Sequence, residues 1–115
     1  MAANDELPRG WSLNAFNTGT TAVIVIPAVQ NIIHVLDTIA FRLTDNLAAI
    51  SENAFVLDGA TVILTFQLFA PTVQIPDDIQ WNGPLAGSVA TSLTIEFGGS
   101  TANTIEEIHV TGHDV

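Results

Sequence analysis

Two histidines near the end of the chain have a spacing that is often associated with metal binding. In "HVTGH", His109 and His113 are four residues apart, which on a helix places both imidazoles on one face, as in many zinc sites. The preceding "TIEE" also resembles a helix capping box. On a strand, however, the two residues lie about 13 Å apart, too far to share an ion. The glycine and the β-branched residues between them favour the strand, so the sequence predicts two solvated histidines and no bound metal.

The acidic residues offer few groups for catalysis. Asp77 and Asp78 at the start of a loop could bind calcium through their oxygens, but adjacent acids are also typical of a solvated turn. Glu106 and Glu107 point to opposite faces if their segment is a strand. They therefore cannot act as an acid–base pair unless another carboxylate joins one of them.

The chain contains none of the motifs for nucleophilic catalysis or phosphate binding. It has no cysteine, which excludes a thiolate nucleophile, a thiolate metal site and a disulfide. It also has no G-x-S-x-G elbow and no G-x-x-x-x-G-K loop. His34 is predicted to be a surface residue, and the clustering of histidines and a carboxylate that a cupin-like metal centre requires is not visible. We therefore expect a protein that is not an enzyme and that has no catalytic residues, metal or cofactor.

The two tryptophans are the remaining candidates for binding. Trp81 in "IQWNGP" could stack on a sugar ring or anchor an interface, although a tryptophan beside glycine and proline often pins a loop to the core. Trp11 follows an Arg-Gly pair and could anchor an N-terminal arm on a neighbouring subunit. Both tryptophans are predicted interface residues.

Length and charge limit the partners that this chain can have. A chain of 115 residues fits a single domain that buries about two thirds of its unfolded surface. The formal charge of -10, with two arginines and no lysine, repels nucleic acid and anionic membranes. The polar start lacks the features of a signal peptide, and no apolar run approaches the roughly 18 residues of a membrane-spanning helix. We expect a soluble protein that is not exported.

The composition combines many apolar residues with few charges. Hydrophobic residues make up 48% of the chain and charged residues 12%, against about 25% charged in an ordinary soluble domain. A surface rich in threonine, serine and asparagine is one explanation. The explanation that we favour is that identical subunits bury part of the apolar excess between them.

All segments of the chain favour β-structure. We expect an N-terminal arm over residues 1–19, with a possible short strand at 11–17, and a β-sandwich domain over residues 20–115. In "TAVIVI" (residues 21–26), both faces of the predicted strand are apolar, with Val23 and Val25 on one of them. Such a strand requires cover on both sides, and a neighbouring subunit is one natural cover.

The longest regular ribbon is "IHVLDTIAFRL", residues 33–43. Residues two apart share a face, so the predicted core face consists of Ile33, Val35, Asp37, Ile39, Phe41 and Leu43. Asp37 does not suit a core. A bulge at this position or a satisfied hydrogen bond would resolve the conflict.

The second half of the chain contains further strand and turn signals. Residues 44–55 are predicted to be a loop or a short helical turn, and "DG" at 58–59 is predicted to be a turn before a strand at 60–69. Pro71 and Pro76 limit "TVQI" to an edge strand, and residues 76–88 are predicted to form a long loop. Strands follow over 89–97 and 104–115. The predicted inward residues of these strands are Val62, Leu64, Phe66, Leu68, Leu93, Ile95 and Phe97.

Seven or eight antiparallel strands without a convincing helix predict an all-β, jelly-roll-like sandwich. The order of "IPAVQNIIHVLDTIAFRLT", a threonine-rich central strand, "PLAGSVATSLTIEF" and "IEEIHVTGHDV" resembles the small all-β structural proteins of tailed bacteriophages, in particular capsid decoration (cement) and head-fibre proteins. The resemblance covers roughly residues 20–115.

This resemblance implies a homotrimer in the virion, on the outer surface of the phage head, that binds the major capsid protein and stabilises the shell. Closure of the trimer would bury apolar faces such as those of Val23, Val25 and Ile63. The alternative is a carbohydrate- or receptor-binding module that uses Trp81 and the loop acids.

Overall fold

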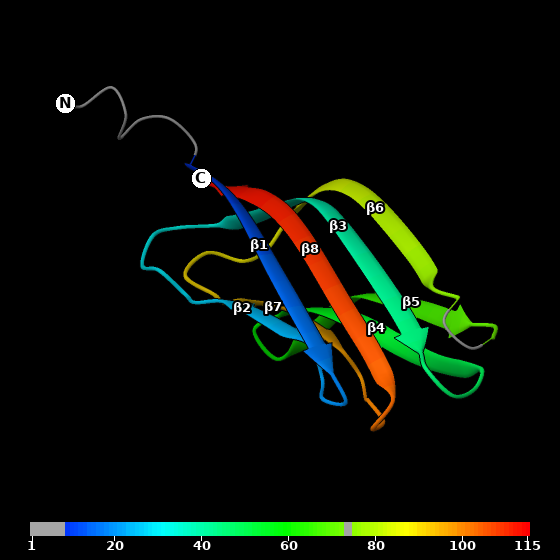
Figure 1. Cartoon of the computed structure of the whole chain (residues 1–115). Helices are drawn as coiled ribbons and strands as arrows, with labels where there is room; N and C mark the ends of the chain where they lie inside the picture. Colours follow the sequence, from blue (N-terminus) through cyan, green and yellow to red (C-terminus); the bar gives the residue numbers. More distant parts are fainter. Residues whose placement is uncertain (1–8, 73–74) are drawn as a thin grey trace.

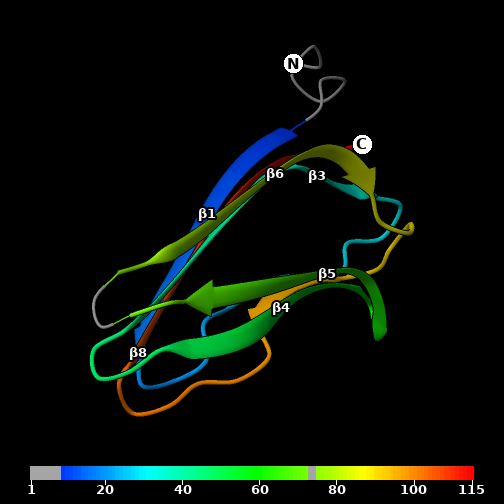
Figure 2. The same ribbon diagram turned by 90° about the vertical axis from the view of Figure 1, so that its right-hand side faces the viewer.

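The computed structural model describes residues 9–72 and 75–115, and within these ranges the chain forms eight β-strands. They are β1 (Arg9–Thr18), β2 (Val23–Ile26), β3 (His34–Asp45), β4 (Ile50–Asp58), β5 (Thr61–Ala70), β6 (Asp77–Ala86), β7 (Leu93–Phe97) and β8 (Thr104–Asp114). Two four-stranded sheets, in the orders β1-β8-β3-β6 and β2-β7-β4-β5, face each other as two layers (Figures 1 and 2). The predicted all-β, jelly-roll-like sandwich is confirmed.

The core lies between the two sheets and consists of side chains that alternate along the strands. Phe41 is 1% exposed, and its ring centroid lies 5.3 Å from that of Phe66 and 5.5 Å from that of Phe97. Both rings are tilted or edge-on to Phe41, which aromatic pairs prefer. The predicted inward residues of β7, which are Leu93, Ile95 and Phe97, are all buried.

Asp37, an acidic residue on the predicted core face, is accommodated by both expected features, a bulge and a hydrogen bond. The register of β3 against β6 and β8 shifts between Leu36 and Thr38, which indicates a bulge at Asp37. The carboxylate of Asp37 also accepts a 2.8 Å hydrogen bond from Nδ1 of His113. Because the bulge shifts the alternation, His34 and Leu36 are also buried, although they were predicted on the outer face. The predicted Val35 is buried at 6% exposure, whereas the predicted Ile33 is half-buried.

Two segments that are predicted to be loops are strands in the structure. Residues 50–55, predicted to be a loop or helical turn, are the first part of β4, and residues 77–86 of the predicted long loop form β6. The strand signal of β6 is weak because the segment contains aspartate, asparagine, glycine and proline, which are rare in strands. Pro84 is tolerated because β6 is an edge strand. Of the predicted "TVQI" strand, the structure describes one bridge between Thr72 and Ile75, and Val73 and Gln74 lie outside the described residues.

A second register shift, between Val56 and Leu57, changes the face of residues near the β4–β5 turn. Val62 is 50% exposed and therefore does not belong to the core, contrary to the prediction. Leu64, Phe66 and Leu68 do pack against the core as predicted. The turn at "DG" is confirmed, with Gly59 at a φ of 60°, where glycine has no steric penalty.

The first half of the chain also matches the predicted strands. The expected strand at 11–17 lies within β1, which pairs with β8 along its length, and residues 1–8 of the expected arm lie outside the described residues. In the described part of the chain, no helix has the length and apolar character needed to cross a membrane.

Candidate functional site

The outer face of the sheet β2-β7-β4-β5 is apolar near the β4–β5 turn and more polar toward Ser51, Asn53 and Gln67. Register pairing aligns two rows of outward residues across its four strands, Val25–Thr94–Leu57–Val62 and Val23–Glu96–Phe55–Thr65. Val25 and Val62 are 55% and 50% exposed, and Glu96 is the only charged residue in the two rows. We refer to Val23, Val25, Phe55, Leu57 and Val62 as the apolar face.

The outer face of the sheet β1-β8-β3-β6 is mostly polar. Its rows are Ser12–Thr111–Thr38–Asn82, Asn14–His109–Ala40–Gln80 and Phe16–Glu107–Arg42–Asp78. Ala40 has the smallest side chain at the centre of this face. Two adjoining hollows of about 270 and 280 Å³ share Ala40, Gln80 and His109, and together we call them the polar trough.

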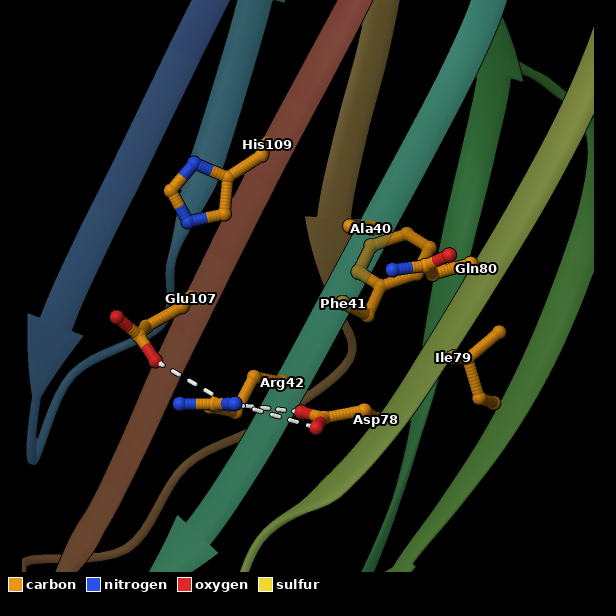
Figure 3. A pocket seen from close by; sticks show the side chains of 8 residues that line it. All are labelled: Ala40, Phe41, Arg42, Asp78, Ile79, Gln80, Glu107 and His109. Carbon is orange, nitrogen blue, oxygen red and sulfur yellow. Dashed lines mark hydrogen bonds and ion pairs between the residues drawn. The ribbon is translucent and has the colours of Figure 1, made fainter.

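Ionic and hydrogen-bond contacts hold the side chains around the polar trough. Nε of Arg42 donates to Asp78 at 2.7 Å and its Nη2 donates to the same carboxylate at 3.2 Å, while Glu107 lies 3.9 Å away on the other side (Figure 3). The hydrogen bond and charge of Asp78 raise the pKa of Arg42. Nδ1 of His109 donates to Oδ1 of Asn14 at 2.6 Å. These contacts hold polar side chains in fixed positions on an exposed surface. Such preorganised groups are suited to binding a polar ligand.

The two histidines with metal-like spacing both lie on β8 and have separate partners. His109 bonds to Asn14 and His113 bonds to Asp37, so the strand interpretation is confirmed. Among residues 9–72 and 75–115, no group of three or more histidine, cysteine or acidic side chains is placed to hold a metal ion.

His34 is buried, which corrects the prediction that it is a surface residue. It is 2% exposed and donates from Nδ1 to Asp114 at 2.6 Å and from Nε2 to the carbonyl of Pro27 at 2.7 Å. Asp114 also accepts a 3.0 Å hydrogen bond from Nε1 of Trp11. Because a carboxylate and a carbonyl are both acceptors, each ring nitrogen of His34 lies opposite an acceptor. This polar cluster joins β1, β3, β8 and the β2–β3 loop at one end of the sandwich.

A second buried polar group lies at the opposite end of the sandwich. Glu106 of β8 is fully buried, and its carboxyl group lies beside that of Glu52, which comes from β4 in the other sheet. Burial is the main cause that raises the pKa of Glu106 to about 9. Glu52 is therefore the additional carboxylate that Glu106 would need to form an acid–base pair. However, full burial of Glu106 keeps it away from a substrate.

The predicted interface residues fall into two groups. Val23 and Val25 point outward and are 40% and 55% exposed. Trp11, Ile63 and Trp81 are partly buried and pack against the core. The role of all five residues in an interface stays a prediction.

The acids that were expected in a loop lie on β6. Oδ2 of Asp77 accepts a 2.6 Å hydrogen bond from the backbone of Phe69, and Asp78 bonds to Arg42. Gln80 and its neighbours in the polar trough are not among the predicted site residues, because the sequence predicts a loop where β6 lies. The alternation of polar Asp78, Gln80 and Asn82 with apolar side chains was a signal that could have found them.

Comparison with known proteins shows similarity at the level of the fold. No protein-family model and no curated protein matches this sequence. Among solved structures, the GH26-CBM35 β-(1,4)-mannanase of Podospora anserina matches with a TM-score of 0.50 and 12% identity over 90% of this chain. The chain spans 28% of the length of that protein. At this identity, the likeness shows a shared β-sandwich fold alone.

Two other solved structures are also similar to this chain. A structure titled "CBM4 structure and function" matches with a TM-score of 0.45 and 12% identity. The match covers 87% of this chain and 70% of that structure's chain. The tobacco streak virus coat protein matches with a TM-score of 0.41 and 5% identity. The match covers 91% of this chain and 86% of the coat-protein chain.

Proposed function

We propose that this protein is a non-enzymatic structural component of a virus particle, a capsid decoration (cement) protein that trimerises on the outer surface of a tailed-phage head. The observation that carries the proposal is the apolar face. Five of the eight outward side chains in its two rows are apolar and one is charged. Apolar side chains that gather on one exposed sheet face mark interaction sites in many proteins, so a protein partner is a natural cover for them.

The area required for such an interface is available on this small domain. A standard interface buries about 800 Å² on each partner. The total accessible surface of the chain is 6153 Å², so one interface would occupy roughly an eighth of it. Contacts made only to the assembled shell would stabilise that shell by mass action. The formal charge of -10 would keep the exterior soluble and separate from nucleic acid.

The test is the oligomeric mass, measured by light scattering over a range of concentrations, together with co-sedimentation with heads built from the major capsid protein of the same genome. We expect a trimer that binds heads, and we expect Val25→Glu to yield monomers, because a buried charge without a partner is strongly unfavourable. Ser12→Glu on the polar outer face is the matched control and should keep the trimer. A wild-type monomer that does not bind heads would contradict the proposal.

The alternative function, a carbohydrate-binding module, is favoured by a different observation, the polar trough. Arg42, Asn14 and His109 are held by neighbouring side chains, so few rotamers would be frozen when a sugar binds. A glycan array tests this alternative. Binding that is lost in Gln80→Ala and kept in Thr65→Ala, on the opposite sheet, would support it. Absence of binding to any glycan would count against it.

A further inference from the structure

Two carboxyl groups from opposite sheets meet in the core without a positive charge beside them. Glu106 is fully buried, and its Oε1 accepts a 2.8 Å hydrogen bond from the backbone N–H of Ala22. The Oε2 atoms of Glu106 and Glu52 are both buried, and the described residues provide neither atom with a donor. Two ionised carboxylates can only accept hydrogen bonds, so a single proton between the two Oε2 atoms would satisfy both.

The groups around this pair make the loss of its proton unfavourable. From β3, the nearly buried Asp45 adds a third negative charge, and its Oδ1 accepts the backbone N–H groups of Leu47 and Ala48. From β1, the inward Asn17 directs its amide to the carbonyl of Thr21. Ala22, the residue before β2, contributes only its neutral backbone, and β7 approaches with the apolar Phe97. Among the described residues, no cationic side chain contributes to the electrostatics of either glutamate.

We propose that Glu52 and Glu106 share one proton across the core, and that this proton holds the two sheets together at the end of the sandwich where β1 leads into β2. Loss of the proton in alkaline solution would leave two buried carboxylates facing each other and would loosen this end of the molecule. A hollow of about 530 Å³ beside Glu52, lined also by Ser51, Asn53, Ser100 and Thr101, opens this end to solvent.

The direction of the pH effect follows from the environment of the pair. Burial, the hydrogen bond with Glu52 and the charge of Glu52 raise the pKa of Glu106 from 4.5 to about 9. Burial also raises the pKa of Glu52, against the opposing effect of its hydrogen bond with Glu106. Because the folded pKa of Glu106 is raised, its stabilising effect is complete below pH 4.5 and decreases as the pH rises toward about 9.

The experiment measures unfolding by urea at several pH values between about 5.5 and 8.5 in the wild type and in Glu106→Gln. The glutamine amide can donate to Glu52 at every pH. We therefore expect the unfolding constant of the wild type to rise, relative to that of Glu106→Gln, by up to about tenfold per pH unit. Glu107→Gln is the matched control, because Glu107 is the next residue on β8 and points to the opposite face. It should keep the pH slope of the wild type.

A second measurement keeps the proposal testable if Glu106→Gln does not fold. In the wild type, ¹³C NMR of the carboxyl carbons should show one glutamate that remains protonated at pH 7. The proposal is wrong if every glutamate of the folded protein is ionised at pH 7, or if Glu106→Gln and the wild type have the same pH slope.

Discussion

Replacement of His34 by leucine should be one of the most destabilising single changes in this protein. The substitution keeps most of the side-chain volume but removes both hydrogen bonds of the ring, to Asp114 and to the carbonyl of Pro27. A buried acceptor that loses its hydrogen-bond donor costs about 1–3 kcal/mol, and this substitution removes the donor of two acceptors. Asp114 retains its hydrogen bond from Trp11 and is 22% exposed, so we expect a total below two full penalties, about 3 kcal/mol.

This loss corresponds to a large change in thermal stability. Unfolding entropy is about 2.1 cal/mol/K per residue, so a chain of 115 residues has roughly 0.24 kcal/mol/K. A loss of about 3 kcal/mol should therefore lower the Tm by about 12 °C. Urea unfolding monitored by tryptophan fluorescence measures the loss in the free energy of unfolding. Trp11 reports on this region directly because it bonds to Asp114.

The chain itself provides a matched control for this experiment. His109 also donates from Nδ1 to a side-chain oxygen, but on the exposed outer face, so His109→Leu should change stability by less than about 0.5 kcal/mol. A double-mutant cycle of His34→Leu with Asp114→Ala should give a coupling of about 1–3 kcal/mol. If His34→Leu is no more destabilising than His109→Leu, the two hydrogen bonds of His34 do not have the role that we assign to them.

Two further predictions concern packing. Phe41→Ala should cost about 3–5 kcal/mol in urea unfolding because it removes a ring at the centre of the core, whereas Phe16→Ala, at a position that is 60% exposed, should stay within about 0.5 kcal/mol. Gly112→Ala should lower stability by about 1–3 kcal/mol or more, because its Cβ would overlap the carbonyl oxygen of Val35 and the ring of Trp11. Gly10→Ala, with its nearest contact at 3.8 Å, is the control and should be tolerated sterically.

The two polar clusters lie at opposite ends of the sandwich and differ in what the sequence revealed about them. His34 lies within a predicted strand, but the two-residue period placed it on the outer face. The bulge at Asp37 reversed that assignment, because a shift of one residue moves each side chain to the other side of a sheet. Glu52 lies in a segment predicted to be a loop or helical turn, and nothing near it in sequence indicated a second carboxyl group.

The sequence by itself determined the fold class and several strands. In β7, Leu93, Ile95 and Phe97 alternate with polar residues, and "DG" marks the β4–β5 turn, so both could be predicted from their own residues. Alternation and turn chemistry are local properties, which is why they are visible without a structure.

Only the tertiary structure decided which polar groups meet and which apolar groups remain exposed. His34 and Asp114 are 80 positions apart in the chain, and Glu52 reaches Glu106 from the opposite sheet. The same pairing of distant strands directed Trp81 to the core and left Val25 and Val62 on the surface. The physical reason is that register and bulges set the direction of each side chain, and both depend on strands that are far apart in sequence.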